Sequence, residues 1–264
     1  MATRTTEDRE VGRAEDTIIR YTVSGPADGP TVVLIHGWAC DRRDYDELTG
    51  RLPDGHRVIA VDLAEHGESH SARDVWTMAE FARDVAAVVE AESVGECTVV
   101  GHSLGGAVAV EVGRLLPDTV GRIIALDALH YLFLFGTLER QQAEEMVRTV
   151  RDDFVGTVRN MVESGSPTGT DPALKNSYFE KMVTVRQPAG TRAFEGLVAW
   201  DMEEALEAVK QPITVLAVRD LATQEALDRL ADRIDIVLTE LGSHHFHRES
   251  PEETARLIAG IMSA

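Results

Sequence analysis

The chain has 264 residues, a formal net charge of −19 at pH 7 and a hydrophobic fraction of 44%. This length can bury a large core, and no apolar run approaches the roughly 20 residues that a membrane-spanning helix needs. Nucleic acid and anionic membranes would repel so acidic a protein, so neither is an expected partner. We expect a soluble globular protein that acts on a small molecule.

The N-terminal segment and the cysteines bear on the cellular compartment. Residues 1–16 are polar and mixed in charge, without the apolar stretch of a secretory signal. Nothing in the size of the chain calls for a disulfide between Cys40 and Cys97. We therefore expect a cytoplasmic protein with reduced thiols.

Strand and helix patterns alternate along the chain up to about residue 130 and again after residue 210. Segment 16–23 is β-branched and alternating, which predicts an antiparallel edge strand. Continuous apolar runs are typical of strands buried on both faces of a parallel sheet, and they occupy 31–35, 57–61, 98–100, 121–126, 213–218 and 234–238. Helical patterns occupy 77–92, the stretch after residue 103, 223–232 and 251–262. This alternation predicts a doubly wound, mostly parallel α/β sheet.

The alternation stops between about Tyr131 and Lys210. This stretch has no strand-like run, and it carries amphipathic segments at 137–160 and 176–185. We interpret it as an inserted helical cap. The predicted division is a core of residues 1–130 and 211–264, with a cap of residues 131–210.

A β-branched run leads directly into the motif Gly101-His102-Ser103-Leu104-Gly105 and then into a small-residue helix. Glycines two positions before and two after the serine let the neighbouring backbone approach closely. A strand, a sharp turn and a helix in this order place the serine hydroxyl at the apex of a strained elbow. Ser103 is therefore the candidate nucleophile.

The order of motifs along the chain resembles that of the α/β-hydrolase fold superfamily, from about Thr17 onward. The motifs that carry the resemblance are His36-Gly37-Trp38, Asp62-x-x-x-His66-Gly67-x-Ser69, the serine elbow, the cap and a late histidine. The resemblance implies an oxyanion hole made by the backbone N–H groups of Leu104 and Trp38. It implies no cofactor.

The histidine that would serve as general base lies among three histidines in residues 244–247. Relatives commonly place this histidine five residues before an acid at the start of the final helix, which selects His244 by counting back from Glu249. A common Gly-x-x-His-Phe arrangement selects His245 instead, and we favour His244. A metal site is disfavoured, because neither an acidic helix motif nor paired cysteines stand nearby.

Two carboxylates are candidates for the acid that orients the histidine. The commoner family arrangement places it after the strand that follows the cap, where this chain has Asp220 but lacks the usual glycine. A smaller group of relatives, including some dehalogenases and the cofactor-free quinolone dioxygenases, places it before the cap, where this chain has Asp127. We lean slightly to Asp127.

Several other residues are expected to line the substrate site. They are His36, Trp38, His130 and Tyr131, although packing around the elbow is the favoured role for His36. Apolar walls are expected from the cap residues Tyr131, Phe133, Phe135, Met182 and Trp200. Glu65, where many relatives have glycine, would disfavour anionic substrates if its loop reached the cleft.

These observations predict acyl transfer to water, with a small or medium-sized neutral ester, lactone or related carbonyl compound as substrate. One alternative is a cofactor-free dioxygenase of the same fold that acts on a quinolone-type heteroaromatic. The other is a ligand-binding protein that keeps the pocket without turnover. Self-association into a homo-oligomer is compatible with the sequence, which does not fix the oligomeric state.

Overall fold

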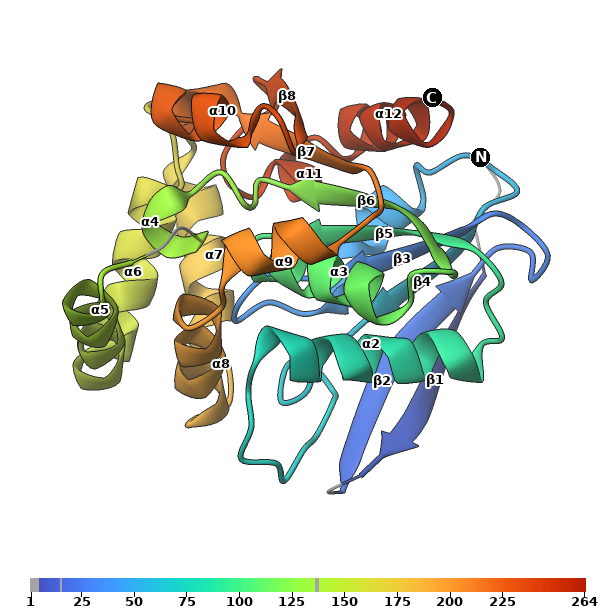
Figure 1. Ribbon diagram of the computed structural model, residues 1–264, viewed down its shortest axis with the longest axis horizontal. Coiled ribbons are helices and arrows are strands. Elements are labelled where there is room, and N and C mark those ends of the chain that lie inside the picture. Colours follow the sequence, from blue (N-terminus) through green and yellow to red (C-terminus); the bar gives the residue numbers. More distant parts are fainter. Residues whose placement is uncertain (1–4, 15, 136–137) are drawn as a thin grey trace.

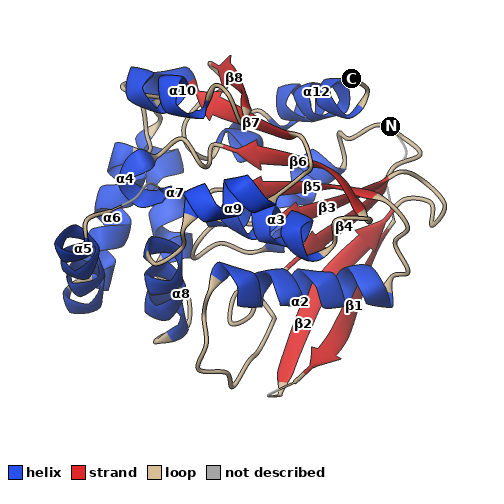
Figure 2. Ribbon diagram, viewed as in Figure 1, coloured by secondary structure: helices blue, strands red, loops and turns tan. Residues whose placement is uncertain are grey.

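The computed structural model describes residues 5–14, 16–135 and 138–264, which contain one eight-stranded sheet (Figures 1 and 2). The strand order is β1-β2-β4-β3-β5-β6-β7-β8. β1, β2 and β4 pair antiparallel, and the strands from β4 to β8 pair parallel. The predicted mostly parallel sheet is confirmed. The strands are β1 Thr6–Arg13, β2 Thr17–Ser24, β3 Thr31–Ile35, β4 Arg57–Val61, β5 Cys97–His102, β6 Val120–Leu126, β7 Ile213–Val218 and β8 Asp235–Thr239.

Helices cover both faces of the sheet, as predicted (Figure 2). α2 and α3 pack on one face, and α1 and α12 pack on the other, so each face has its own buried apolar cluster. The core helices are α1 Asp46–Thr49, α2 Met78–Ala91, α3 Leu104–Leu115, α9 Met202–Ala208, α10 Gln224–Leu230, α11 Phe246–Glu249 and α12 Pro251–Met262, with 3₁₀ turns at Arg42–Tyr45 and Arg219–Leu221.

The edge of the sheet differs from the prediction. Segment 16–23 was expected at the edge, but β2 lies inside β1, which pairs with it antiparallel along its whole length. β1 has the sequence Thr-Glu-Asp-Arg-Glu-Val-Gly-Arg, and its side chains are exposed or half-buried. Its pairing rests on backbone hydrogen bonds and on ion pairs such as Arg13 with Asp84 and Arg9 with Glu92, so hydrophobic periodicity could not reveal it.

A group of helices inserted between β6 and β7 lies beside one end of the sheet (Figure 1). These are α4 Leu132–Phe135, α5 Arg140–Asp152, α6 Phe154–Ser164, α7 Pro172–Met182 and α8 Ala189–Val198. The amphipathic stretch 137–160, whose first residue lies outside the described part, divides into α5 and α6. The division follows from Asp153, whose carboxylate accepts from Gly156 N–H at 2.8 Å and starts a new helix.

The last helix of the predicted cap belongs structurally to the core. α9 lies against α3, where Glu204 pairs with Arg114 at 3.2 Å. Just before α9, the Trp200 indole donates to Glu111 of α3 at 2.7 Å. The group of helices over the end of the sheet therefore comprises α4 to α8, which we call the cap. It ends earlier than the expected boundary at residue 210.

Within the described ranges, no helix has both the length and the apolarity to cross a bilayer. Cys40 and Cys97 are buried and unpaired. Over the same ranges, no three histidine, cysteine or acidic side chains gather in a way that could hold a metal ion.

Candidate active site

Ser103 occupies a strained turn between β5 and α3. Its backbone has φ 52° and ψ −120°, a region that L-residues adopt at a cost of about 1–3 kcal/mol. The serine hydroxyl lines a cavity between the sheet and the cap. The predicted serine elbow is thus present, with its side chain directed at a space where a substrate can bind.

The glycines of the motif allow three pieces of backbone to meet at this turn. A Cβ atom on Gly101 would stand 2.0 Å from the carbonyl oxygen of Gly105. A Cβ atom on Gly105 would stand 2.3 Å from the carbonyl oxygen of Ile35 in β3. Real Cβ atoms do not approach so closely, so only glycine fits at either position.

The loop after β3 approaches the serine from the other side. A Cβ atom on Gly37 would lie 2.7 Å from His102 Nδ1 and 3.2 Å from Ser103 Cβ. This approach places the loop that carries the N–H of Trp38 beside the serine, and the N–H of Leu104 follows the serine at the start of α3. Neither N–H donates to any other described residue, so both are available for an oxyanion.

The fully buried Asp127 pairs with the half-buried His244 next to the elbow. Asp127 follows β6 with no solvent exposure, and its Oδ1 accepts the backbone N–H of Val218 at 2.7 Å. Its Oδ2 lies 2.7 Å from Nδ1 of His244. This bond places the proton on Nδ1, so Nε2 of His244 keeps a free lone pair.

His244 is positioned by backbone contacts as well as by the carboxylate. Its N–H donates to the carbonyl of Gly165, at the end of α6, at 2.8 Å. Its carbonyl accepts from Nε2 of His102 at 2.9 Å. The histidine is therefore held by the elbow on one side and by the cap on the other.

The second carboxylate and the second histidine do not enter this pair. Asp220 lies in the 3₁₀ turn after β7, exposed at the rim of the cavity, and its carboxylate bonds to no described residue. His245 stacks on Tyr178 with ring centroids 4.2 Å apart. Of the predicted alternatives, the structure brings Asp127 and His244 together and leaves Asp220 and His245 apart from them.

The neighbouring histidines are buried in an uncharged state. The rings of His102, His245 and His247 pack together, with centroids of His102 and His247 4.3 Å apart. Burial lowers the pKa of His102 and His245 well below the ordinary value, and it lowers the pKa of His247 to about 3. Near neutral pH, these three rings fill space around His244 without adding charge.

His36 does not line the cavity, so its expected contact with substrate is corrected. Its Nε2 accepts the N–H of Leu63 at 3.0 Å, and its Nδ1 lies 2.7 Å from the carbonyl of Gly37. Burial lowers the pKa of His36 to about 4. Both ring nitrogens are used in fixing the loop after β3, which agrees with the packing role that the sequence favoured.

The cavity has a volume of about 460 Å³, within the usual range for small-molecule sites. Of the expected lining residues, Trp38, His130, Tyr131, Phe133 and Met182 face it, whereas Phe135 and Trp200 lie elsewhere in the packed interior. Among the residues that the structure describes, no lysine or arginine lines the cavity, and the acidic lining residues are Asp220 and Glu225.

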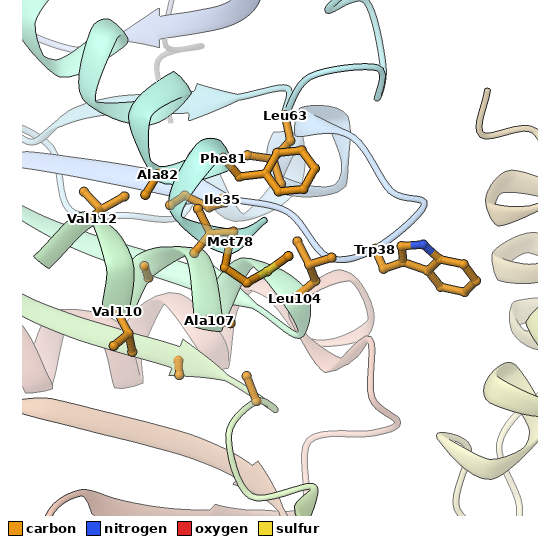
Figure 3. Close-up of a cluster of buried hydrophobic side chains, with 14 of the residues drawn as sticks. Ile35, Trp38, Leu63, Met78, Phe81, Ala82, Leu104, Ala107, Val110 and Val112 are labelled. Carbon is orange, nitrogen blue, oxygen red and sulfur yellow. The ribbon is translucent and has the colours of Figure 1, made fainter. Parts of the chain in front are cut away.

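Trp38 connects the core to the cap. Figure 3 shows its indole at the outer side of the buried apolar cluster to which it belongs, pointing away from the other labelled side chains. The indole N–H donates to the carbonyl of Gly190 in α8 at 2.7 Å, and its ring contacts Phe194 and Phe154 with centroids 5.2 Å and 5.4 Å away. The side chain thus forms a cavity wall while it fixes α8.

Glu65 does not reach the cavity, so it cannot select substrates there. Its carboxylate lies 2.8 Å from Arg186, in the loop between α7 and α8. Arg186 also donates to the backbone carbonyls of Gly67 and Ser69. This cluster, which we call the cap clamp, ties the cap to the loop after β4.

Sequence reasoning missed two groups that bind the Asp127 carboxylate. One is the N–H of Val218, a backbone donor that no sequence pattern indicates. The other is the hydroxyl of Tyr131, which donates to Oδ2 and which we expected only as a substrate contact. An aromatic hydroxyl four residues after a candidate acid is the signal that could have suggested it.

Comparisons with known proteins bear on the family and the fold of the chain. The profile of the alpha/beta hydrolase family matches residues 32–257. A bifunctional esterase/perhydrolase from Acinetobacter calcoaceticus is 30% identical over 221 residues, which cover 76% of this chain and 78% of that protein. A serine hydrolase-like protein from Danio rerio is 34% identical over 92% of this chain and 85% of its own. The crystal structure of the enol-lactonase from Burkholderia xenovorans LB400 superposes with a TM-score of 0.82 at 17% identity, covering 97% of this chain and 100% of that one.

Proposed function

We propose that this chain, which belongs to the alpha/beta hydrolase family and is a hydrolase, cleaves neutral esters or lactones through an acyl-enzyme on Ser103. The observation that carries the proposal is the hydrogen bond between the buried carboxylate of Asp127 and His244, next to a strained serine that faces an apolar cavity. A serine hydroxyl is a weak nucleophile at neutral pH and needs a base of this kind.

In the first half of the proposed reaction, Ser103 Oγ attacks the substrate carbonyl carbon while His244 Nε2 accepts the hydroxyl proton. The negative charge that develops on the carbonyl oxygen is held by the N–H groups of Leu104 and Trp38. Asp127 stabilises the imidazolium that forms. The tetrahedral intermediate then expels the alkoxide, which takes the proton from His244 and leaves an acyl group on the serine.

In the second half, His244 Nε2 accepts a proton from water, and the resulting hydroxide attacks the acyl carbonyl. The same N–H groups hold the second oxyanion. Collapse of this intermediate releases the carboxylic acid and returns the proton to Ser103. Each oxyanion donor is worth roughly 3 kcal/mol of transition-state stabilisation in enzymes of this type.

The cavity lining supports an apolar, uncharged substrate. Its walls are aromatic and aliphatic side chains such as Trp38, Phe194 and Met182, and none of the described lining residues is a lysine or arginine that could pair with a substrate carboxylate. The carboxylates of Asp220 and Glu225 at the rim would repel an anion. Esters of neutral acyl groups are therefore favoured over esters that carry an acidic group.

The test is labelling with a fluorophosphonate probe, together with hydrolysis of p-nitrophenyl esters of increasing acyl length. The wild-type chain should be labelled and should hydrolyse the esters, and Ser103→Ala should do neither. Ser164→Ala is the matched control, because Ser164 also lines the cavity but lies in the cap; it should behave as wild type. Absence of labelling would favour a ligand-binding protein, and oxygen uptake with a hydroxyquinolone that survives Ser103→Ala would favour the dioxygenase.

A further inference from the structure

We propose that Tyr131 is a positioning residue that sets the basicity of His244 through the shared carboxylate of Asp127. This inference rests on the proposed function, because it concerns how the base of that reaction is tuned. Tyr131 is the last residue of the loop between β6 and α4, so it belongs to the same short stretch of chain as the carboxylate that it contacts.

The contact geometry puts two donors on one oxygen. The Tyr131 hydroxyl donates to Oδ2 of Asp127, and Nδ1 of His244 lies 2.7 Å from the same Oδ2. The hydroxyl oxygen also stands 3.4 Å from Nδ1 of His244. The tyrosine and the histidine therefore divide the hydrogen-bonding capacity and the negative charge of a single carboxylate oxygen.

The tyrosine acts as the donor in this contact. Burial, together with the neighbouring charge of Asp127, raises the pKa of Tyr131 well above its ordinary value, so the hydroxyl keeps its proton. A protonated hydroxyl next to a carboxylate can only donate. Hydrogen bonds to a charged acceptor are stronger than neutral ones, so this bond lowers the charge that Asp127 presents to His244.

The backbone before Tyr131 is bent so that this contact can form. Asp127 has φ 45° and Leu129 has φ 69°, both in the left-handed region that residues other than glycine rarely adopt. The turn folds the chain back, so that a side chain four residues after the aspartate reaches its carboxylate. Strain of this kind persists only where surrounding contacts enforce it.

The other groups around the carboxylate do not perform this role. Oδ1 of Asp127 accepts the N–H of Val218 and lies 3.5 Å from Nε2 of His130. The Nδ1 atom of His130 lies 3.1 Å from the carbonyl of Ala128, and burial lowers the pKa of His130, so near neutral pH this ring is uncharged. On Oδ2, the atom that binds His244, the Tyr131 hydroxyl is the second donor.

The predicted consequence is a change in the pH dependence of hydrolysis. Without the Tyr131 hydroxyl, Asp127 offers more charge to His244 and stabilises the imidazolium, which is inactive as a base. The acidic limb of kcat/KM for a p-nitrophenyl ester should therefore shift upward by about one pH unit in Tyr131→Phe. His102 and His245, which flank His244, stay uncharged across this range because burial lowers the pKa of each well below its ordinary value.

The experiment compares the pH profiles of wild type, Tyr131→Phe and Tyr21→Phe. Tyr21 is the matched control, because its hydroxyl also donates to a carboxylate, that of Glu92 at 2.7 Å, on the β1 side of the sheet. An upward shift confined to Tyr131→Phe supports the proposal. Coincident profiles for all three proteins would overturn it and leave Tyr131 as a packing residue.

A second readout does not need turnover. The Nδ1 proton of His244 should give a downfield proton NMR signal, because it is bonded to a buried carboxylate. Tyr131→Phe should move this signal and Tyr21→Phe should not, and an unmoved signal overturns the proposal. Full activity in Ser103→Ala would refute the proposed function. The NMR signal does not depend on Ser103, so the comparison of Tyr131→Phe with wild type would still decide the role of Tyr131.

Discussion

The pairing of Asp127 with His244 makes a sharp prediction about which carboxylate supports catalysis. Asp127→Asn keeps the shape of the side chain and an oxygen for the N–H of Val218, but it removes the negative charge. Asp220→Asn makes the same chemical change at the exposed rim of the same cavity. The lost charge faces His244 in the first variant, where the carboxylate is buried, and it faces solvent in the second.

The size of the effect follows from the geometry. Nδ1 and Oδ2 are 2.7 Å apart, which places the centres of the two charges roughly 4 Å apart. At an effective dielectric constant near 20, their attraction is about 4 kcal/mol in the transition state. That energy corresponds to about 10³-fold in rate, and the loss of tautomer control adds to it. We expect Asp127→Asn to lower kcat/KM by about 10³ to 10⁴-fold.

The assay is steady-state hydrolysis of a p-nitrophenyl ester by both variants, with circular dichroism and Tm to show that each is folded. Asp220→Asn should stay within about twofold of wild type, because an exposed unpaired carboxylate contributes little at this distance. A large loss in Asp220→Asn together with near-normal kinetics in Asp127→Asn would refute the reasoning.

Three further predictions concern the framework of the site. Gly105→Ala should fail to fold or should show a much lower Tm in differential scanning fluorimetry, because its Cβ would lie 2.3 Å from a β3 carbonyl oxygen. The control Gly95→Ala, whose Cβ would meet open space, should match the Tm of the wild type. Arg186→Met, which opens the cap clamp, should lower Tm by about 2–4 °C and speed amide exchange in α7 and α8, and unchanged exchange would contradict the clamp. Burial lowers the pKa of His36 to about 4 and of His66 to about 3, so below pH 6.5 these two side chains bind more protons in the unfolded chain than in the folded one. The free energy of unfolding, measured with urea, should therefore fall as the pH drops from 6.5 towards 4. A flat profile would disprove this linkage.

Much of the fold could be predicted because the parallel strands are buried on both faces. Continuous apolar runs predicted β3, β4 and β7 to the residue. The β1 strand escaped prediction because its charged side chains face solvent and its pairing is made by the backbone, which carries no sequence signal. The division of the long cap segment at Asp153 was missed because amphipathic periodicity continues across it.

The site could be predicted only in part. Ser103 and its glycines form a local motif, so sequence sufficed to propose the elbow. Sequence reasoning favoured Asp127 as the acid only slightly, because Asp127 and Asp220 both follow parallel strands and therefore lie at the same edge of the sheet. The contact of Tyr131 was not predicted either, because a side chain four residues after the acid reaches it only through left-handed backbone angles at two residues other than glycine.

The position of the buried carboxylate directly after β6 affects which part of this protein can change its sequence without loss of the base. In a chain that places this acid after β7, the loop there must keep one conformation to hold the histidine. Here that loop carries Asp220, Thr223 and Glu225 on the rim of the cavity, and none of these side chains bonds to His244. Residues 219–225 are therefore a suitable place to vary length and sequence in a library for new substrates, because the contact between His244 and Asp127, which follows β6, does not involve their side chains.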